Sequence, residues 1–193
     1  MRRSPFRRHI KVGAVVAVAA SSVIAVTLVI SAPLSSTGSD ELYSWAFPGA
    51  YAEYLGSGTI QGVPISLNHT LGILRVNSTK AEFLIVTLET MDSGPPHVDR
   101  SIAWLPATIS DNPPFLVNDG GVKVVRYVTN ITLEGKVLPV IANSILGPSG
   151  GNLNITSYVS RDLHFPIEYV LSFGNGPPVT LRVVRTNIPG LLP

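Results

Sequence analysis

The longest hydrophobic feature of the chain is a largely apolar stretch over residues 12–30, rich in Val, Ala and Ile, with Ser21 and Ser22 in its middle. It contains no charged side chain, and as a helix it would span about 28 Å, close to the thickness of the hydrocarbon core of a bilayer. Five Lys and Arg residues precede it, and the next basic residue is Arg75. Because basic residues beside a membrane segment tend to stay in the cytoplasm, we expect a basic cytoplasmic arm over residues 1–11, a transmembrane anchor over residues 12–32, and the remainder outside.

The same stretch has a second interpretation as a cleaved signal peptide, which would make the protein secreted. The best cleavage position follows Ala32, but Ile30 and Pro33 around it disfavour cleavage, and the stretch is longer than a usual signal core. Within it, small residues recur at every fourth position, a spacing that allows two membrane helices to approach closely. These helix-packing candidates are Gly13, Ala17, Ser21 and Ala25.

Residues 33–49 are expected to form a linker and a short amphipathic helix. A flexible Ser/Thr/Gly spacer comes first, and the acidic pair Asp40 and Glu41 then suits the first turn of a helix. Leu42 and Trp45 would share one helical face, and the helix would end at Pro48. We expect this piece to close one end of the following domain, because a Trp more often fills a core than a recognition site.

From residue 50 onward the hydrophobic pattern changes to alternation with a period of two, which is typical of β-strands. Eight or nine strands are predicted, at residues 51–61, 70–76, 81–91, 102–105, 122–129, 131–142, 152–160, 167–173 and 179–188. Pro, Gly and Asn separate most of them, so residues 50–193 are predicted to form an all-β, mainly antiparallel sandwich or partly open barrel.

Several details of these strands can be predicted as well. Residues 70–76 and 81–91 form a hairpin, and the second of these strands is apolar on both faces, as in a strand covered on both sides. Residues 167–173 and 179–188 form another hairpin at a half-buried edge. Gly56 and Gly58 indicate a bulge or bend, Gly135 a bend within a strand, and Pro139 an edge position or a break in a strand.

Composition narrows the functional classes. The chain has 193 residues and no cysteine, which excludes disulfides, thiolate metal sites and cysteine nucleophiles. Five of its 14 basic residues lie in the first eleven positions, so the exported part carries nine against 12 acidic residues. A basic domain surface is the mark of nucleic-acid binding, and this domain has none, so we expect no nucleic-acid partner.

The clearest chemical motif is the N-glycosylation sequon, in which an Asn stands two residues before a Ser or Thr. Four sequons lie in the exported part, and their asparagines are Asn68, Asn77, Asn130 and Asn154. Most fall near strand ends or turns, where a glycan would stand clear of a sheet. With an outside location, the sequence predicts a glycoprotein.

No catalytic, metal-binding or cofactor-binding residues are predicted. His69 is the middle residue of a sequon and is expected to be solvated, while His97 lies in a Pro-rich loop without a second His at a ligand spacing. His164 is expected at a strand start. Ser149 stands among glycines but lacks the strand-to-helix setting of a nucleophile elbow. The chain is therefore not expected to be an enzyme.

The layout resembles that of small archaeal envelope proteins of unknown function, with one N-terminal membrane segment and a Cys-free, Thr/Val/Asn-rich β domain bearing several sequons. The last third also resembles the open half-barrels of periplasmic lipoprotein carriers, through Phe165, Pro166 and Ile167 at a strand start and through the closing strand over residues 181–188. These resemblances imply an envelope location and an open β architecture, and they carry over no functional residue.

Three functions follow as hypotheses. The first is a membrane-anchored extracytoplasmic β domain of binding or structural type, with an envelope glycan, a lipid or a surface-layer protein as partner. The second is a pilin-type filament subunit, based on the small-residue spacing of the apolar stretch. The third is an extracytoplasmic hydrolase whose carboxylates are brought together by the fold.

Overall fold

The computed structural model describes residues 41–60, 62–91, 94–107, 116–119, 122–146, 153–174 and 176–192. The predicted membrane segment, with Gly13, Ala17, Ser21 and Ala25, lies outside the described residues. No helix long and apolar enough to cross a membrane occurs within the described ranges.

The described residues form ten antiparallel strands, which confirms the prediction of an all-β domain. They are β1 (Tyr51–Ile60), β2 (Val63–Val76), β3 (Lys80–Met91), β4 (His97–Pro106), β5 (Leu116–Asp119), β6 (Val122–Leu133), β7 (Lys136–Leu146), β8 (Leu153–Ser160), β9 (Pro166–Phe173) and β10 (Val179–Thr186). The strand β5 was not predicted, because its four residues fall within a Pro- and Gly-rich stretch that favours a loop.

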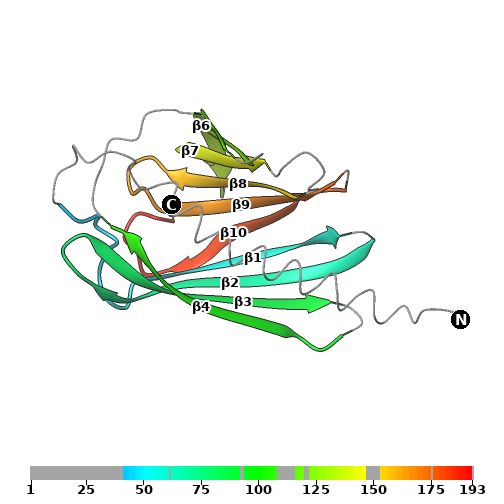
Figure 1. Ribbon diagram of the computed structural model, residues 1–193, viewed down its shortest axis with the longest axis horizontal. Coiled ribbons are helices and arrows are strands. Elements are labelled where there is room, and N and C mark those ends of the chain that lie inside the picture. Colours follow the sequence, from blue (N-terminus) through cyan, green and yellow to red (C-terminus); the bar gives the residue numbers. More distant parts are fainter. Residues whose placement is uncertain are drawn as a thin grey trace, which may run out of the picture.

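The strands form one open sheet in the order β4-β3-β2-β1-β10-β9-β8-β7-β6-β5. It consists of two meanders, β1 to β4 and β5 to β10, which are joined by antiparallel pairing of β1 with β10 (Figure 1). The two meanders thus belong to a single sheet rather than to the two separate sheets of a sandwich. The hairpin of β9 and β10 lies in the middle of this sheet, so its predicted edge position is wrong.

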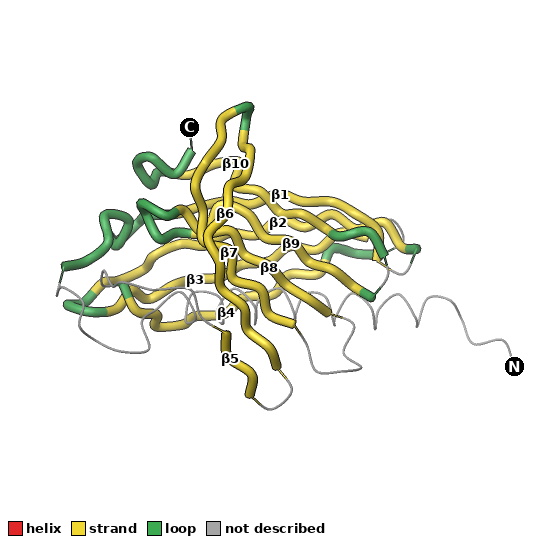
Figure 2. The backbone as a smooth tube through the Cα atoms, turned by 90° about the horizontal axis from the view of Figure 1, so that it is seen from above, coloured by secondary structure: helices red, strands yellow, loops and turns green. Residues whose placement is uncertain are grey.

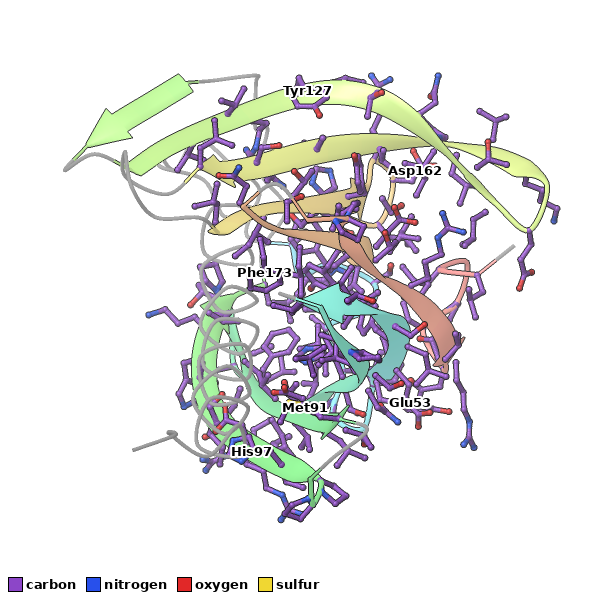
Figure 3. All side chains as sticks on the ribbon, turned by 90° about the vertical axis from the view of Figure 1, so that its right-hand side faces the viewer. Glu53, Met91, His97, Tyr127, Asp162 and Phe173 are labelled. Carbon is purple, nitrogen blue, oxygen red and sulfur yellow. The ribbon has the colours of Figure 1, made fainter. Side chains whose placement is uncertain are left out.

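The sheet is strongly curved, so that its two meanders face one another across the interior (Figure 3). Gly56 lies at the joint between them, where a Cβ would overlap the carbonyl oxygen of Thr180. Gly58 similarly faces Val179. Both glycines therefore allow β1 and β10 to approach closely, while the irregularity of β1 lies at Glu53 and Tyr54 and not at the glycines as predicted.

Trp45 fills one end of the interior and connects the two meanders. Its ring lies 5.8 Å from that of Phe83 on β3 and 5.3 Å from that of Phe165 just before β9. Its Nε1 donates a hydrogen bond of 2.7 Å to the Leu163 carbonyl oxygen. Trp45 is 2% exposed, so the predicted role of this segment in closing the domain is confirmed.

The segment around Trp45 is not helical, in contrast to the prediction. Residues 41–49 form turns with no helix, and Tyr43 N donates to the Ala107 carbonyl oxygen at the end of β4. Gly49 has a φ of +85° and its N–H donates to the Ile73 carbonyl oxygen. These contacts with distant strands replace the local hydrogen bonds of a helix.

Two further sequence predictions about the strands need correction. The predicted bend at Gly135 is a tight turn in which Glu134 and Gly135 have φ values of 49° and 81°, so β6 and β7 form a hairpin. Pro139 lies within β7, a central strand of the sheet, but at its position β7 pairs with β6 alone, because the pairing with β8 ends at Val140. Its carbonyl oxygen accepts the N–H of Arg161 and so faces β8, and the N–H that proline lacks would face the same way. This place is beyond the last residue pair of β7 and β8, so the sheet loses no hydrogen bond to the proline.

The hairpin of β2 and β3 is confirmed, with its turn at residues 77–80. On β3 the inward side chains are buried, while Leu84, Val86 and Leu88 on the other face are half-buried. Figure 2 shows the whole fold from above as strands joined by loops. The interior that these strands enclose holds the polar site described next.

Candidate functional site

A row of four polar side chains crosses the inner face of the second meander. Arg126 on β6 pairs with Asn143 on β7, Asn143 pairs with Ser157 on β8, and Ser157 pairs with Tyr169 on β9. All four are buried, with exposed fractions of 4% or less. We call these residues the inner polar row, and its register aligns them across four adjacent strands.

The inner polar row continues across the joint of the sheet and ends at a buried carboxylate. Tyr169 pairs with Leu181, which pairs with Gly56 on β1. Gly56 pairs with Leu67 on β2, and Leu67 pairs with Glu89 on β3. The same line across the curved sheet thus places a guanidinium near one end and a carboxylate near the other.

A second group of polar residues lies beside this line on the first meander. Tyr54, His69 and Thr87 are directly opposite one another on β1, β2 and β3. The His69 ring lies 5.8 Å from the Tyr54 ring and 6.3 Å from the Tyr169 ring, and Tyr54 and Tyr169 are 5.3 Å apart. The Tyr169 ring on β9 therefore contacts two side chains of the first meander across the interior.

Some hydrogen bonds of the site are satisfied within the fold. Arg126 Nε donates to Asn143 Oδ1 over 2.7 Å, the Tyr54 hydroxyl donates to the Pro166 carbonyl oxygen over 2.8 Å, and His69 Nδ1 lies 2.9 Å from Thr87 Oγ1. These bonds fix the orientation of the guanidinium, of the phenol and of the imidazole.

Other buried polar atoms of the site have no hydrogen-bond partner among the described residues. They are the Tyr169 hydroxyl, Ser157 Oγ, His69 Nε2 and both carboxylate oxygens of Glu89. Buried polar atoms are almost always hydrogen-bonded, because an unmade bond costs about 1–3 kcal/mol. Their concentration on one interior surface indicates a place where bound polar groups complete the hydrogen bonding.

Burial also sets the charges of this surface. It lowers the pKa of His69 to about 3 and raises the pKa of Glu89 to about 7. It lowers the pKa of Arg126 to about 10 and raises that of Tyr169. At neutral pH the site therefore contains a neutral imidazole, neutral phenols, a partly protonated carboxyl group and one cation, which suits a largely uncharged polar ligand.

The alternating pattern places these residues inward, although sequence reasoning missed most of them. Ser157 stands between the buried Ile155 and Val159, and His69 between the buried Leu67 and Leu71. A polar residue at an inward position of an alternating strand was the available signal. The prediction that His69 is solvated is wrong, because it is 0% exposed.

The other polar residues considered from the sequence lie elsewhere. His97 is the exposed first residue of β4, and His164 is in a turn with a φ of 53°, where its ring stacks on Tyr43 at 5.2 Å. Glu168 is bound by Arg182 Nε over 2.5 Å. The glycine-rich segment containing Ser149 lies outside the described residues. No group of His, Asp or Glu that could hold a metal ion occurs in the part of the chain that the structure describes.

Two acidic residues, Glu89 and Asp99, lie close together where β3 pairs with β4. Glu89 pairs with His97, and Thr87 pairs with Asp99, so Glu89 and Asp99 are diagonal neighbours on the inner face. Diagonal neighbours in an antiparallel sheet have Cα atoms about 7–8 Å apart. Glu89 is buried and Asp99 is half-buried, so the two carboxyl groups have different environments.

The four sequon asparagines lie on four different strands or turns. Asn130 and Asn154 are exposed on β6 and β8. Asn77 is exposed in the turn between β2 and β3, where its Oδ1 accepts the N–H groups of Thr79 and Lys80. Asn68 is half-buried in the middle of β2, away from any strand end.

Comparison with protein-family models and with curated proteins gave no match for this chain. A functional proposal therefore depends on the site itself, on the fold that carries it, and on the predicted membrane segment.

Proposed function

We propose that this chain is a single-pass membrane protein whose β domain lies outside the membrane and binds a neutral, hydroxyl-rich envelope ligand, with a glycan as the preferred class. The observation that carries the binding function is the set of unpartnered polar atoms on Ser157, Tyr169, His69 and Glu89 in the interior. The basic arm and apolar stretch of residues 1–32 and the four sequons support the location.

The chemistry of the surface favours a carbohydrate. Hydroxyl groups of a sugar both donate and accept hydrogen bonds, and they match the Ser157 hydroxyl, the Tyr169 hydroxyl and the neutral imidazole of His69. In this proposal the domain is a partly open barrel, and the ligand enters between the edges formed by β4 and β5.

Location is tested by protease treatment of intact cells that carry the full-length chain with a tag at its C-terminus. We expect the tag to be removed while a cytoplasmic control protein stays intact. A tag that survives under conditions that cut other surface proteins would contradict the outside location.

Binding is tested by titrating the full-length chain in detergent with neutral oligosaccharides and following its tryptophan fluorescence. Tyr169→Phe removes one hydroxyl from the site and should weaken binding about five- to tenfold, the effect of one hydrogen bond of about 1 kcal/mol. Tyr127→Phe is the matched control, because Tyr127 is exposed on the other face of β6. Equal affinities of the two variants would contradict binding at the inner polar row.

A second candidate function, glycoside hydrolysis, is favoured by the diagonal placement of Glu89 and Asp99. Glycosidases use one protonated and one ionised carboxyl group, and burial raises the pKa of Glu89 to about 7. If the protein is a hydrolase, Glu89→Gln abolishes cleavage of a bound oligosaccharide while retaining its binding. Stable oligosaccharides after long incubation with the native chain would leave binding alone as the function.

A further inference from the structure

A hollow of about 380 Å³ lies on the outer face of the sheet, over β1, β2 and β3. Two rows of side chains in register line it. The first row is Leu55, Asn68 and Leu88, and the second is Ser57, Ser66 and Thr90. An asparagine flanked by two leucines thus lies next to a row composed only of hydroxyl side chains.

Asn68 differs in this respect from the other sequon asparagines, none of which lines the hollow. No hydrogen bond joins its side chain to another described residue, whereas the Asn77 side chain is engaged in its turn. Leu55 is 48% exposed, so the hollow leaves apolar surface uncovered beside the Asn68 amide. Both features are explained if a covalently attached group lies in the hollow.

We propose that Asn68 carries an N-linked glycan whose first sugar residues lie in this hollow. A sugar ring is amphipathic, with C–H groups on its faces and hydroxyl groups around its edge. In the hollow the C–H face would pack on Leu55 and Leu88, and the hydroxyl groups would bond to Ser57, Ser66 and Thr90. The volume falls in the lower part of the range of small-ligand sites, roughly 300–1,000 Å³.

The covalent step needs a sugar donor and an enzyme in the same membrane. An oligosaccharyltransferase joins Asn68 Nδ2 to the anomeric carbon of an oligosaccharide carried on a lipid phosphate. The bond from that carbon to the phosphate oxygen breaks, the lipid phosphate leaves with the electron pair, and Nδ2 loses one proton. Because β2 is paired on both sides, transfer to Asn68 must precede the pairing of β1 and β3 with it.

This inference rests on the outside location in the proposed function. Its test expresses the full-length chain in a host that N-glycosylates exported proteins and in a host that does not. Thr70→Ala removes the Asn68 sequon, and Thr70→Ser is the matched control that keeps it. Occupancy of each sequon is measured by mass spectrometry of peptides, and the midpoint of thermal unfolding is measured for both variants from both hosts.

We expect Asn68 to be occupied in the glycosylating host. The difference in unfolding midpoint between Thr70→Ser and Thr70→Ala should then be about 2–4 °C larger for protein from this host than for protein from the other host. Thr132→Ala removes the exposed Asn130 sequon and should show no such difference between the hosts. Replacement of Ser66 by Ala should reduce the extra stability without changing occupancy at Asn68.

Two results would overturn this inference alone. One is occupancy of the exposed sequons without occupancy of Asn68, and the other is an occupied Asn68 whose glycan adds no stability. If no sequon is occupied in the glycosylating host, both this inference and the predicted glycoprotein are wrong. Protease treatment of the same cells then tests the outside location separately.

Discussion

His69 Nδ1 lies 2.9 Å from Thr87 Oγ1 in the interior of the sheet, where the two residues are directly opposite one another on β2 and β3. Both side chains are 0% exposed. The contact orients an imidazole whose other nitrogen, Nε2, has no partner among the described residues. A buried neutral histidine in this position makes the stability of the fold sensitive to acid.

The first prediction concerns this acid sensitivity. Burial lowers the pKa of His69 to about 3, below its ordinary value of 6.5. Between these values the unfolded chain binds a proton that the folded chain does not, so His69 lowers the free energy of unfolding as the pH falls below 6.5. The slope is about 1.4 kcal/mol per pH unit for one proton. Urea unfolding at a series of pH values measures it.

His69→Gln should remove this slope, at a cost of about 1 kcal/mol at neutral pH for the lost bond to Thr87. His97→Gln is the control, because His97 is exposed on β4, and it should keep the acid response of the native chain. An unchanged acid response in His69→Gln would show that other groups cause it.

The second prediction concerns Glu89, whose titration acts in the opposite direction. Burial raises its pKa to about 7 from an ordinary 4.5. Between these values the unfolded chain releases a proton that the folded chain retains, so Glu89 lowers the free energy of unfolding as the pH rises through this window. The contributions of His69 and Glu89 therefore offset each other between about pH 4.5 and 6.5.

Glu89→Gln should be more stable than the native chain at pH 8, by on the order of 1–3 kcal/mol, because it removes a buried carboxylate without a partner among the described residues. Glu53→Gln is the control on the outer face of β1. Equal stability of Glu89→Gln and the native chain at pH 8 would mean that a bound group already compensates the carboxylate.

The alternation of hydrophobic residues predicted the strands well, because it records which face of each strand is buried. Val179, Leu181 and Val183 are inward, as their spacing predicts. The same pattern does not record which strands are neighbours. The pairing of β1 with β10 joins residues more than a hundred positions apart, so β10 was assigned to an edge although it lies at the centre.

The candidate site could be predicted only in part, for a related reason. His69, Ser157 and Tyr169 each occupy an inward position that their own strand reveals. Their proximity follows from the curvature of the sheet and the register of its strands, which are non-local. The sequon around Asn68 also misdirected the interpretation of His69, because the motif suggested a solvated loop where β2 is paired on both sides.

The third prediction concerns the joint between the two meanders. In Gly56→Ala the new Cβ would overlap the Thr180 carbonyl oxygen and lie 3.0 Å from the Leu181 Cα, and these are backbone atoms that cannot rotate away. We expect a loss of about 1–3 kcal/mol or more in the free energy of unfolding.

Gly72→Ala is the matched control for Gly56→Ala, because Gly72 lies within β2 and no atom lies within 4 Å of the place that its Cβ would take. It should be neutral or stabilising by about 0.5–1 kcal/mol through reduced freedom of the unfolded chain. Similar stabilities of the two variants would contradict the close approach of β1 and β10.

The fourth prediction concerns Trp45, which fills the interior between the meanders. Trp45→Phe removes the Nε1 donor and leaves the Leu163 carbonyl oxygen without it, so we expect a loss of about 1–3 kcal/mol in the free energy of unfolding. Trp45→Ala should cost about 3–5 kcal/mol, because a large cavity would separate Phe83 from Phe165.

Trp104→Phe is the control for both variants. Trp104 is 42% exposed on β4, it lies 5.7 Å from the Arg75 guanidinium, and its side chain hydrogen-bonds Glu82. The cation–π contact contributes about 0.5–1 kcal/mol and the hydrogen bond about 1 kcal/mol, so the loss should be smaller than that of Trp45→Ala. The chain has two tryptophans, and Trp104→Phe leaves Trp45 as the fluorescent probe of its own surroundings. If Trp45 joins the two meanders, its emission should shift to the red in the same urea range in which circular dichroism reports loss of the sheet. A shift at clearly lower urea would mean that the end of the interior opens while the sheet persists.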